Sequence, residues 1–301
     1  MNGAVHLLEQ VAASVVGIHA SVPREHPSVA VGLGADRRGS GTLISAEGLV
    51  LTVNYVVMGA RRLIVTLTDG TQYDGRIAAQ DFTSNLALVK IEPSAQLPHL
   101  RITSSRDLVP GQDAFIVAST GNEARRADSG LVSYIGPFDA LWEFVLERCV
   151  MVSAMNLGFG GAPVCNVKGE LFGVSYLSMA EVGRAVLAIP TECFLDVRDE
   201  LVSQGRRVSA RPWAWLGLLS YTLREHVVVA GLLPGGPAEK AGLKQGDVIL
   251  AIDGQGLSER RALYEALRSR QPGEALNLRI FRDNKVHTLE VAGIRVEDYF
   301  G

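Results

Sequence analysis

Aromatic residues are scarce in this 301-residue chain, and neither sign of charge is in large excess. Phe, Trp and Tyr make up 6% of the residues, which argues against the aromatic stacking platform of single-strand nucleic-acid binders. The 29 basic and 32 acidic residues give a net charge of -3. That balance lacks the basic footprint of proteins that bind nucleic acid or anionic membranes. We therefore expect no nucleic-acid partner.

The chain also lacks the usual patterns of a metal site, a membrane span or a signal peptide. Its three cysteines form no CxxC pair and its six histidines form no HExxH motif, so we expect no metal and no cofactor. No apolar run approaches the ~20 residues of a transmembrane helix. No basic residue precedes Arg24, and the odd cysteine count favours a reducing compartment, so the sequence as written predicts a cytoplasmic protein. A missing N-terminal leader would instead make it periplasmic or exported.

The residues that are present predict a mainly β protein with a separate C-terminal domain. Hydrophobic residues make up 47% of the chain, and at roughly 100–200 residues per domain its length allows two or three domains. Short apolar runs separated by turn residues fill 14–95 and 100–195, which predicts barrels or sandwiches. Further strands are expected at 226–233, 247–252, 275–282 and 286–292, with a helix at 259–270 capped by Ser258. We predict domains at 1–203 and 213–297, joined by a linker at 204–212.

Three stretches look like the frames around the catalytic triad of a serine peptidase. They are Gly39–Ala60, Asp81–Lys90 and Asn156-Leu157-Gly158-Phe159-Gly160-Gly161-Ala162-Pro163-Val164. In this order, and followed by the glycine-rich stretch 231–254, they resemble the HtrA/DegP family, whose members are trypsin-like proteases followed by a PDZ domain. The resemblance covers about residues 11–195 and 213–292. It implies a trypsin-like double six-stranded β-barrel followed by a PDZ domain.

The resemblance places the family's catalytic histidine at Tyr55, its aspartate at Asn85 and its serine at Gly160. Glycine offers no nucleophile, tyrosine is a poor general base at neutral pH, and asparagine carries no charge to stabilise an imidazolium. Loss of the nucleophile alone costs about 10⁶ in the turnover of a triad enzyme. We therefore expect no active catalytic residue and no peptidase activity.

Other parts of the cleft are expected to remain. The resemblance places oxyanion-like backbone amides at Gly158 and Gly160. Tyr55 is expected to be a packing residue at the barrel interface, and a new functional role is the alternative. Cys165, five residues beyond Gly160, is expected to be a buried, inert thiol and not a replacement nucleophile.

The C-terminal domain resembles a peptide-binding groove. In the PDZ fold a peptide adds a strand to a sheet edge, and the amides of a loop hold its C-terminal carboxylate. The resemblance places the loop, strand and helix residues of this groove at Leu216, Gly217, Leu218, Leu219, Ala262, Leu263 and Ala266. The alternative is a domain that only packs against the barrels and binds nothing.

The sequence thus predicts a catalytically inactive HtrA-like pseudoprotease that binds peptides or protein C-termini as a scaffold, regulator or chaperone-like holder. One alternative is a serine-type endopeptidase-like hydrolase with residual activity or an unassigned nucleophile. Another is an inactive partner of an active homologue. The family often forms trimers through its N-terminal segment, and the segment of only about a dozen residues here argues against a trimer. A homo-oligomer and a mixed oligomer with an active homologue both stay open.

Overall fold

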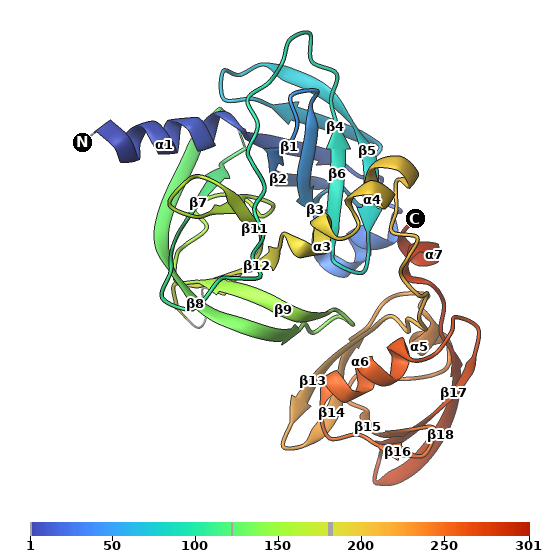
Figure 1. Ribbon diagram of the computed structural model, residues 1–301. Coiled ribbons are helices and arrows are strands. Elements are labelled where there is room, and N and C mark those ends of the chain that lie inside the picture. Colours follow the sequence, from blue (N-terminus) through green and yellow to red (C-terminus); the bar gives the residue numbers. More distant parts are fainter. Residues whose placement is uncertain (1, 122, 180–182) are drawn as a thin grey trace. The chain divides into compact units, whose positions relative to one another are not determined.

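The computed structural model describes residues 2–121, 123–179 and 183–301, which form two compact units (Figure 1). Unit 1 comprises the described residues up to Arg24, together with Leu33–Gly136 and Glu147–Ser209. Unit 2 comprises Glu25–Gly32, Pro137–Leu146 and Ala210–Gly301. Two segments that precede the expected linker, 25–32 and 137–146, therefore belong to unit 2.

The first barrel of unit 1 closes from six antiparallel strands in the order β1-β2-β3-β6-β5-β4. These strands are β1 (Val15–Ser21), β2 (Asp36–Leu43), β3 (Leu49–Val53), β4 (Arg62–Thr66), β5 (Gln72–Asp81) and β6 (Leu86–Lys90). A turn at Asp69-Gly70 joins β4 to β5. Gly70 has a φ of +85°, and the Asp69 carboxylate accepts a 2.9 Å hydrogen bond from the Thr71 amide.

The second barrel closes in the order β10-β11-β12-β9-β8-β7. Its strands are β7 (Asp113–Ser119), β8 (Arg125–Asp139), β9 (Val145–Val152), β10 (Pro163–Cys165), β11 (Leu171–Ser178) and β12 (Val186–Pro190). Buried apolar residues such as Ile116, Val150 and Phe172 fill its interior. The connection between β8 and β9 extends out of the barrel, because residues 137–146 belong to unit 2.

Helical segments are short in this protein. Unit 1 holds α1 (Asn2–Ala13), α2 (Asn54–Val57), α3 (Glu192–Leu195) and α4 (Arg198–Gln204). Unit 2 holds α5 (Pro237–Lys240), α6 (Arg260–Arg268) and α7 (Val296–Phe300), together with all but the last residue of η1 (Val29–Leu33). Within residues 2–121, 123–179 and 183–301, no helix is long and apolar enough to cross a membrane.

Unit 2 is built on a sheet in the order β13-β14-β15-β17-β18, with β16 paired to β15. The strands are β13 (Leu218–Leu223), β14 (His226–Leu232), β15 (Val248–Ile252), β16 (Gln255–Gly256), β17 (Ala275–Arg282) and β18 (Lys285–Ala292). Buried and exposed residues alternate along β17, as the two-residue period of a half-buried strand requires. The turn between β17 and β18 lies at Asp283 and Asn284, whose φ angles of +50° and +58° suit a two-residue hairpin.

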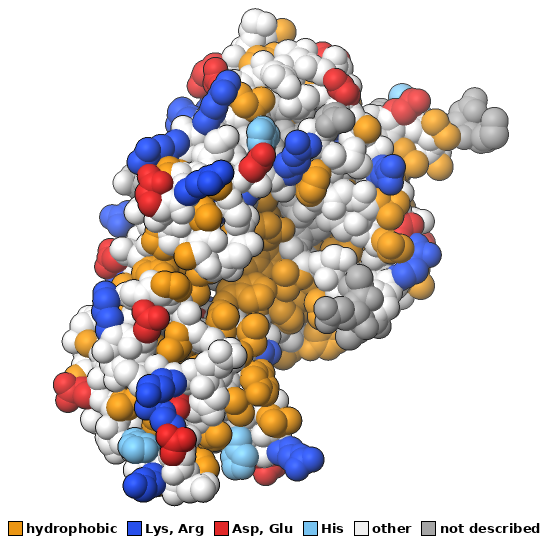
Figure 2. Space-filling model, turned by 180° about the vertical axis from the view of Figure 1, so that it is seen from behind, with side chains coloured by type: hydrophobic (Ala, Val, Ile, Leu, Met, Phe, Trp, Pro, Cys, Tyr) orange, Lys and Arg blue, Asp and Glu red, His pale blue; other side chains and the backbone are white. Residues whose placement is uncertain are grey.

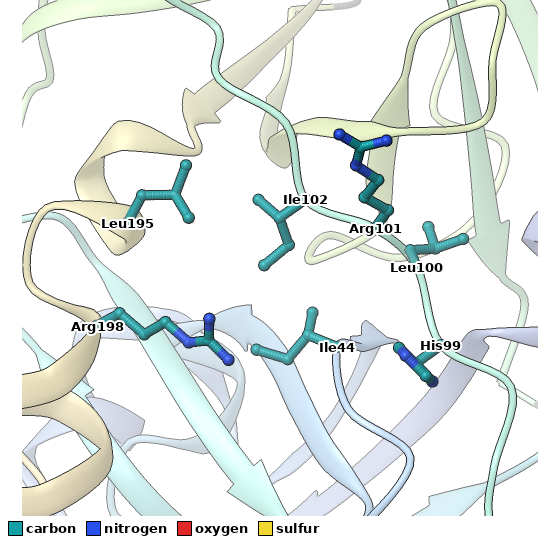
Figure 3. A pocket seen from close by; sticks show the side chains of 7 residues that line it. All are labelled: Ile44, His99, Leu100, Arg101, Ile102, Leu195 and Arg198. Atoms are coloured by element: carbon teal, nitrogen blue, oxygen red, sulfur yellow. The ribbon is translucent and has the colours of Figure 1, made fainter.

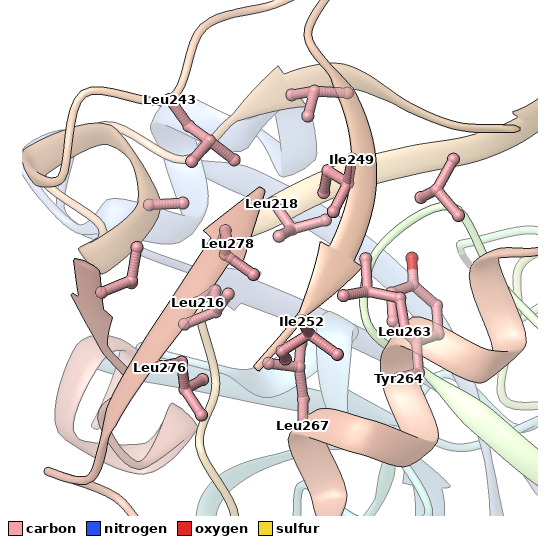
Figure 4. Packing of buried hydrophobic residues seen from close by; sticks show 14 of the residues in the cluster. Leu216, Leu218, Leu243, Ile249, Ile252, Leu263, Tyr264, Leu267, Leu276 and Leu278 are labelled. Atoms are coloured by element: carbon pink, nitrogen blue, oxygen red, sulfur yellow. The ribbon is translucent and has the colours of Figure 1, made fainter. Parts of the chain in front are cut away.

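The core of unit 2 lies between α6 and the sheet. Figure 4 shows Leu263, Tyr264 and Leu267 on α6, packed with buried residues of the strands and of the segment before β13. The prediction that Ser258 caps this helix is wrong. The helix begins at Arg260 after an extended Glu259, and the Arg260 amide donates to the Thr222 hydroxyl at 2.9 Å.

The predicted architecture is confirmed: two six-stranded β-barrels are followed by a separate domain of sheet and helices. The surface carries both signs of charge. In the view of Figure 2, Lys and Arg side chains are interspersed with Asp and Glu, in keeping with the near balance of charge in the sequence.

Candidate functional site

The three predicted triad positions lie on neighbouring segments of unit 1. Tyr55 stands on α2 directly after β3, Asn85 directly before β6, and Gly160 in the loop before β10. The carbonyl of Asn85 accepts a 2.7 Å hydrogen bond from the amide of Asn54, next to Tyr55. The carbonyl of Gly160 accepts a 2.7 Å hydrogen bond from the amide of Ser40. These two backbone hydrogen bonds therefore fix the segments that carry Asn85 and Gly160 to the first barrel.

The Tyr55 hydroxyl occupies the space that a side chain at residue 160 would need. A Cβ atom built on Gly160 would lie only 1.9 Å from Tyr55 Oη. The hydroxyl donates to the Tyr176 carbonyl at 3.2 Å, and the two tyrosine rings pack with their centroids 5.6 Å apart. Tyr55 is thus a packing residue, and its size is complementary to the absence of a side chain at Gly160.

The chemistry of these positions does not suit acyl transfer. Burial raises the pKa of Tyr55 to about 12, so its phenol is neutral at physiological pH and is neither a base nor a nucleophile. Asn85 has a left-handed backbone with a φ of +59°, a conformation that asparagine tolerates better than most residues. The arrangement brings the three positions together without supplying a general base or a nucleophile.

The loop at Asn156–Gly161 is fixed by hydrogen bonds of its own. The Gly158 amide donates to the Asn156 side-chain oxygen at 3.1 Å, and the Phe159 amide donates to the Ser119 carbonyl at 3.0 Å. An oxyanion at the Gly158 amide would have to displace Asn156. The oxyanion-like role of Gly158 and Gly160 stays a prediction.

The cysteines do not offer a substitute nucleophile. Cys165 is completely buried on β10, and burial raises the pKa of its thiol. Burial also raises the pKa of Cys149 to about 11 and that of Cys193 to about 12, so all three are neutral thiols at physiological pH. The described part of the chain contains no group of three or more His, Cys, Asp or Glu residues that could hold a metal ion.

A hollow of about 350 Å³ lies elsewhere in unit 1 (Figure 3). Its lining residues are Ile44, His99, Leu100, Arg101, Ile102, Leu195 and Arg198. None of the predicted site residues borders it, and we assign it no role.

The residues predicted for the peptide groove come together in unit 2. Leu216, Leu218 and Leu263 belong to one buried cluster, and Ala266 packs against that cluster. The predicted set also contains Gly217, Leu219 and Ala262. Gly217 has a φ of +75°. Leu219 lies on the edge strand β13, and Ala262 is half-buried on α6. A left-handed φ between two buried leucines is the conformation that favours glycine at this loop.

The loop amides already hold a carboxylate, that of Glu143. The Leu216 amide donates to Glu143 Oε2 at 3.0 Å, and the Leu218 amide donates to Oε1 at 2.8 Å. Glu143 is 4% exposed, and burial raises its pKa to about 7 because desolvation outweighs the stabilising amides. Sequence reasoning missed this residue. Its only local signal is a single acid within the apolar run Leu141-Trp142-Glu143-Phe144-Val145.

Comparison with protein families supports both domains. Residues 39–174 match the trypsin-like peptidase domain, and residues 214–292 match the PDZ domain. The first match contains Tyr55, Asn85 and Gly160, and the second contains the predicted groove residues. Neither match identifies a ligand.

Curated relatives are named as proteases. The probable periplasmic serine endoprotease DegP-like of Marinomonas sp. (strain MWYL1) is 32% identical over 271 residues, which cover 84% of this chain and 56% of the relative. The putative serine protease HhoA of Synechocystis sp. (strain ATCC 27184 / PCC 6803 / Kazusa) is 29% identical over 276 residues, which cover 84% of this chain and 70% of the relative. The chain thus spans little more than half the length of the DegP-like relative.

Solved structures share the fold of this chain. The structure titled HtrA-type protease AlgW with tripeptide matches with a TM-score of 0.59 and 25% identity, covering 97% of each chain. A serine endoprotease from Yersinia pestis matches with a TM-score of 0.57 over 98% of this chain and 99% of that one. At 21% identity the second likeness concerns the fold alone.

Proposed function

Because this chain belongs to the HtrA/DegP family of trypsin-like peptidases that carry a PDZ domain, we propose that it is a non-catalytic member that binds peptides or protein C-termini. Its PDZ domain would supply the binding site, as a scaffold, a regulator or a chaperone-like holder. The barrels would serve as a folded framework without peptidase chemistry.

The observation that carries the binding part of the proposal is the carboxylate held by the loop before β13. The amides of Leu216 and Leu218 both point at the oxygens of Glu143, at 3.0 and 2.8 Å. A peptide's terminal carboxylate has the same charge and the same two acceptor atoms. The loop therefore has the geometry to hold a C-terminus while the peptide backbone pairs with β13.

The observation that supports the loss of catalysis is the contact between Tyr55 and Gly160. The Tyr55 hydroxyl fills the place of a nucleophilic side chain, and its raised pKa keeps it neutral. The charge that an aspartate would supply is missing at Asn85.

The binding proposal predicts that recognition depends on a free carboxylate. Fluorescent decapeptides ending in Val, Leu or Phe are titrated with the full chain, each in a free-acid and an amidated form, and anisotropy reports binding. We expect the best free-acid peptides to bind at least about tenfold more tightly than their amides, because the amide lacks the charged acceptor. Equal affinity of the two forms would rule out carboxylate recognition by this loop.

The names of the relatives favour a second candidate, a serine-type endopeptidase. A fluorophosphonate probe, which labels only an activated nucleophile, separates the two. The non-catalytic proposal expects no labelled residue. Labelling would support the alternative and direct attention to a nucleophile outside the three triad positions.

The compartment is part of the proposal. DegP-like relatives are named as periplasmic proteins, which supports an exported location and gives no support to the cytoplasmic expectation. Partnership with an active homologue is compatible with the same location.

A further inference from the structure

The tip of the β8–β9 hairpin lies along the edge strand of unit 2 in the manner of a bound peptide. Trp142 pairs with Leu219 of β13 in an antiparallel bridge. The Ser220 amide donates to the Leu141 carbonyl at 2.8 Å. Main-chain pairing of this kind on an edge strand is the way in which PDZ domains add a ligand strand.

A side chain takes the place of a peptide terminus in this arrangement. Pairing with β13 brings the chain to Glu143, whose carboxylate is held by the loop amides. The chain then turns back, because the Ala140 amide donates to the Phe144 carbonyl at 2.8 Å, and the φ of Glu143 is +21°. A continuing chain has no free carboxylate here, and Glu143 supplies one.

The helix α6 holds the same segment from its other side. The Tyr264 hydroxyl lies 3.1 Å from the Ala140 carbonyl and 2.8 Å from the Leu141 carbonyl. The guanidinium of Arg260 pairs with the Asp139 carboxylate and also donates to the Asp139 carbonyl. Strand, loop and helix thus all bond to one short stretch of chain.

The apolar end of the segment is anchored as well. Val145 is 3% exposed and belongs to the same buried cluster as Leu216, Leu218 and Leu263. The Arg268 side chain donates to the Val145 carbonyl at 3.2 Å. Burial of this side chain adds a hydrophobic contribution to the polar contacts.

We propose that residues 139–145 are a built-in ligand of the PDZ groove, and that an external peptide with a free C-terminal carboxylate binds by displacing them. This inference rests on the proposed peptide-binding function. The Leu216 and Leu218 amides hold one carboxylate at a time, so the two ligands exclude one another. The built-in ligand is tethered at both ends, which gives it an effective concentration of millimolar order or more. The apparent affinity for an external peptide is its intrinsic affinity multiplied by the fraction of molecules in which the groove is open.

Truncation of the internal carboxylate tests this competition. The full chain carrying Glu143→Ala is titrated with the same free-acid decapeptides, beside the wild-type chain and Glu290→Ala. Glu290 is a matched control because it is an exposed acid on β18, at the other end of the sheet order from β13. We expect Glu143→Ala to bind the peptides about 10- to 100-fold more tightly than the wild type, and Glu290→Ala to match the wild type.

A second variant keeps the test decisive if Glu143→Ala folds poorly. Asp139→Asn removes the ion pair with Arg260 at the start of the segment and is expected to tighten peptide binding by a smaller factor. Equal affinity of the wild type and both segment variants would overturn the built-in ligand and leave the binding function intact. Absence of binding to every variant, with the fold preserved, would reject the binding function itself and the inference with it.

Discussion

Placing serine at residue 160 by itself is expected to yield no peptidase activity and to lower the free energy of unfolding by about 1–3 kcal/mol. The new Cβ would lie 1.9 Å from the Tyr55 hydroxyl, and the nearest heavy atom after Tyr55 lies 3.6 Å away, in the Tyr176 backbone. Tyr55 is also tied to Tyr176 by a hydrogen bond and a ring contact, so it cannot move freely. The serine would still lack a general base.

A double-mutant cycle measures this complementarity. Tyr55→Phe removes only the hydroxyl, after which the closest ring carbon would lie 3.1 Å from the new Cβ. In urea unfolding followed by far-UV circular dichroism, Tyr55→Phe/Gly160→Ser should regain part of the stability that Gly160→Ser loses. Strictly additive effects of the two substitutions would show that Tyr55 does not restrict residue 160.

The free energy of unfolding of unit 2 is expected to fall by up to about 3 kcal/mol as the pH rises from about 4.5 to about 7, because of Glu143. Burial raises the pKa of this carboxyl from 4.5 to about 7 in the folded state. Between these values the folded chain keeps a proton that the unfolded chain has released, so ionisation favours unfolding. Above about 7 both states are ionised, and this contribution no longer changes with pH.

Tryptophan fluorescence offers a selective readout for this titration. The three tryptophans of the chain, Trp142, Trp213 and Trp215, all belong to unit 2. Urea unfolding at several pH values is compared between the wild type and Glu143→Gln, which keeps the size of the side chain and removes its titration. The wild type should lose stability with rising pH relative to Glu143→Gln. The opposite slope would mean that the loop amides outweigh desolvation at Glu143.

Much of the barrel domain is predictable from local patterns. The frames around Tyr55, Asn85 and Gly160 keep the turns and glycines of the fold, so the sequence places these three positions on adjoining segments. The expected packing role of Tyr55 depends on a large side chain at residue 55 and on the absence of one at Gly160. The sequence shows both once the two loops are known to be neighbours. Turns such as the one at Asp283-Asn284 also have a local cause, since Asp and Asn tolerate a positive φ better than most residues.

The occupation of the groove is not predictable in the same way. The hairpin tip has an ordinary composition, Leu141-Trp142-Glu143-Phe144-Val145. The sequence of the loop before β13 likewise gives no sign that this tip is its partner. Their contact joins residues more than 70 positions apart and depends on a side-chain carboxylate that takes the place of a chain terminus. No periodicity in either segment encodes such a match. For the same reason, the predicted domain ranges 1–203 and 213–297 assign residues 137–146 to the first domain, whereas the structure places them in unit 2.

The most direct test of the account is the fate of an unfolded protein in the presence of this chain. Casein is incubated with the purified full chain at neutral pH, and the products are identified by mass spectrometry. We expect casein to be recovered intact, because Tyr55, Asn85 and Gly160 supply no base, no charge and no nucleophile. Casein fragments that persist after repurification of the chain, together with labelling of the chain by a fluorophosphonate probe, would contradict the non-catalytic assignment.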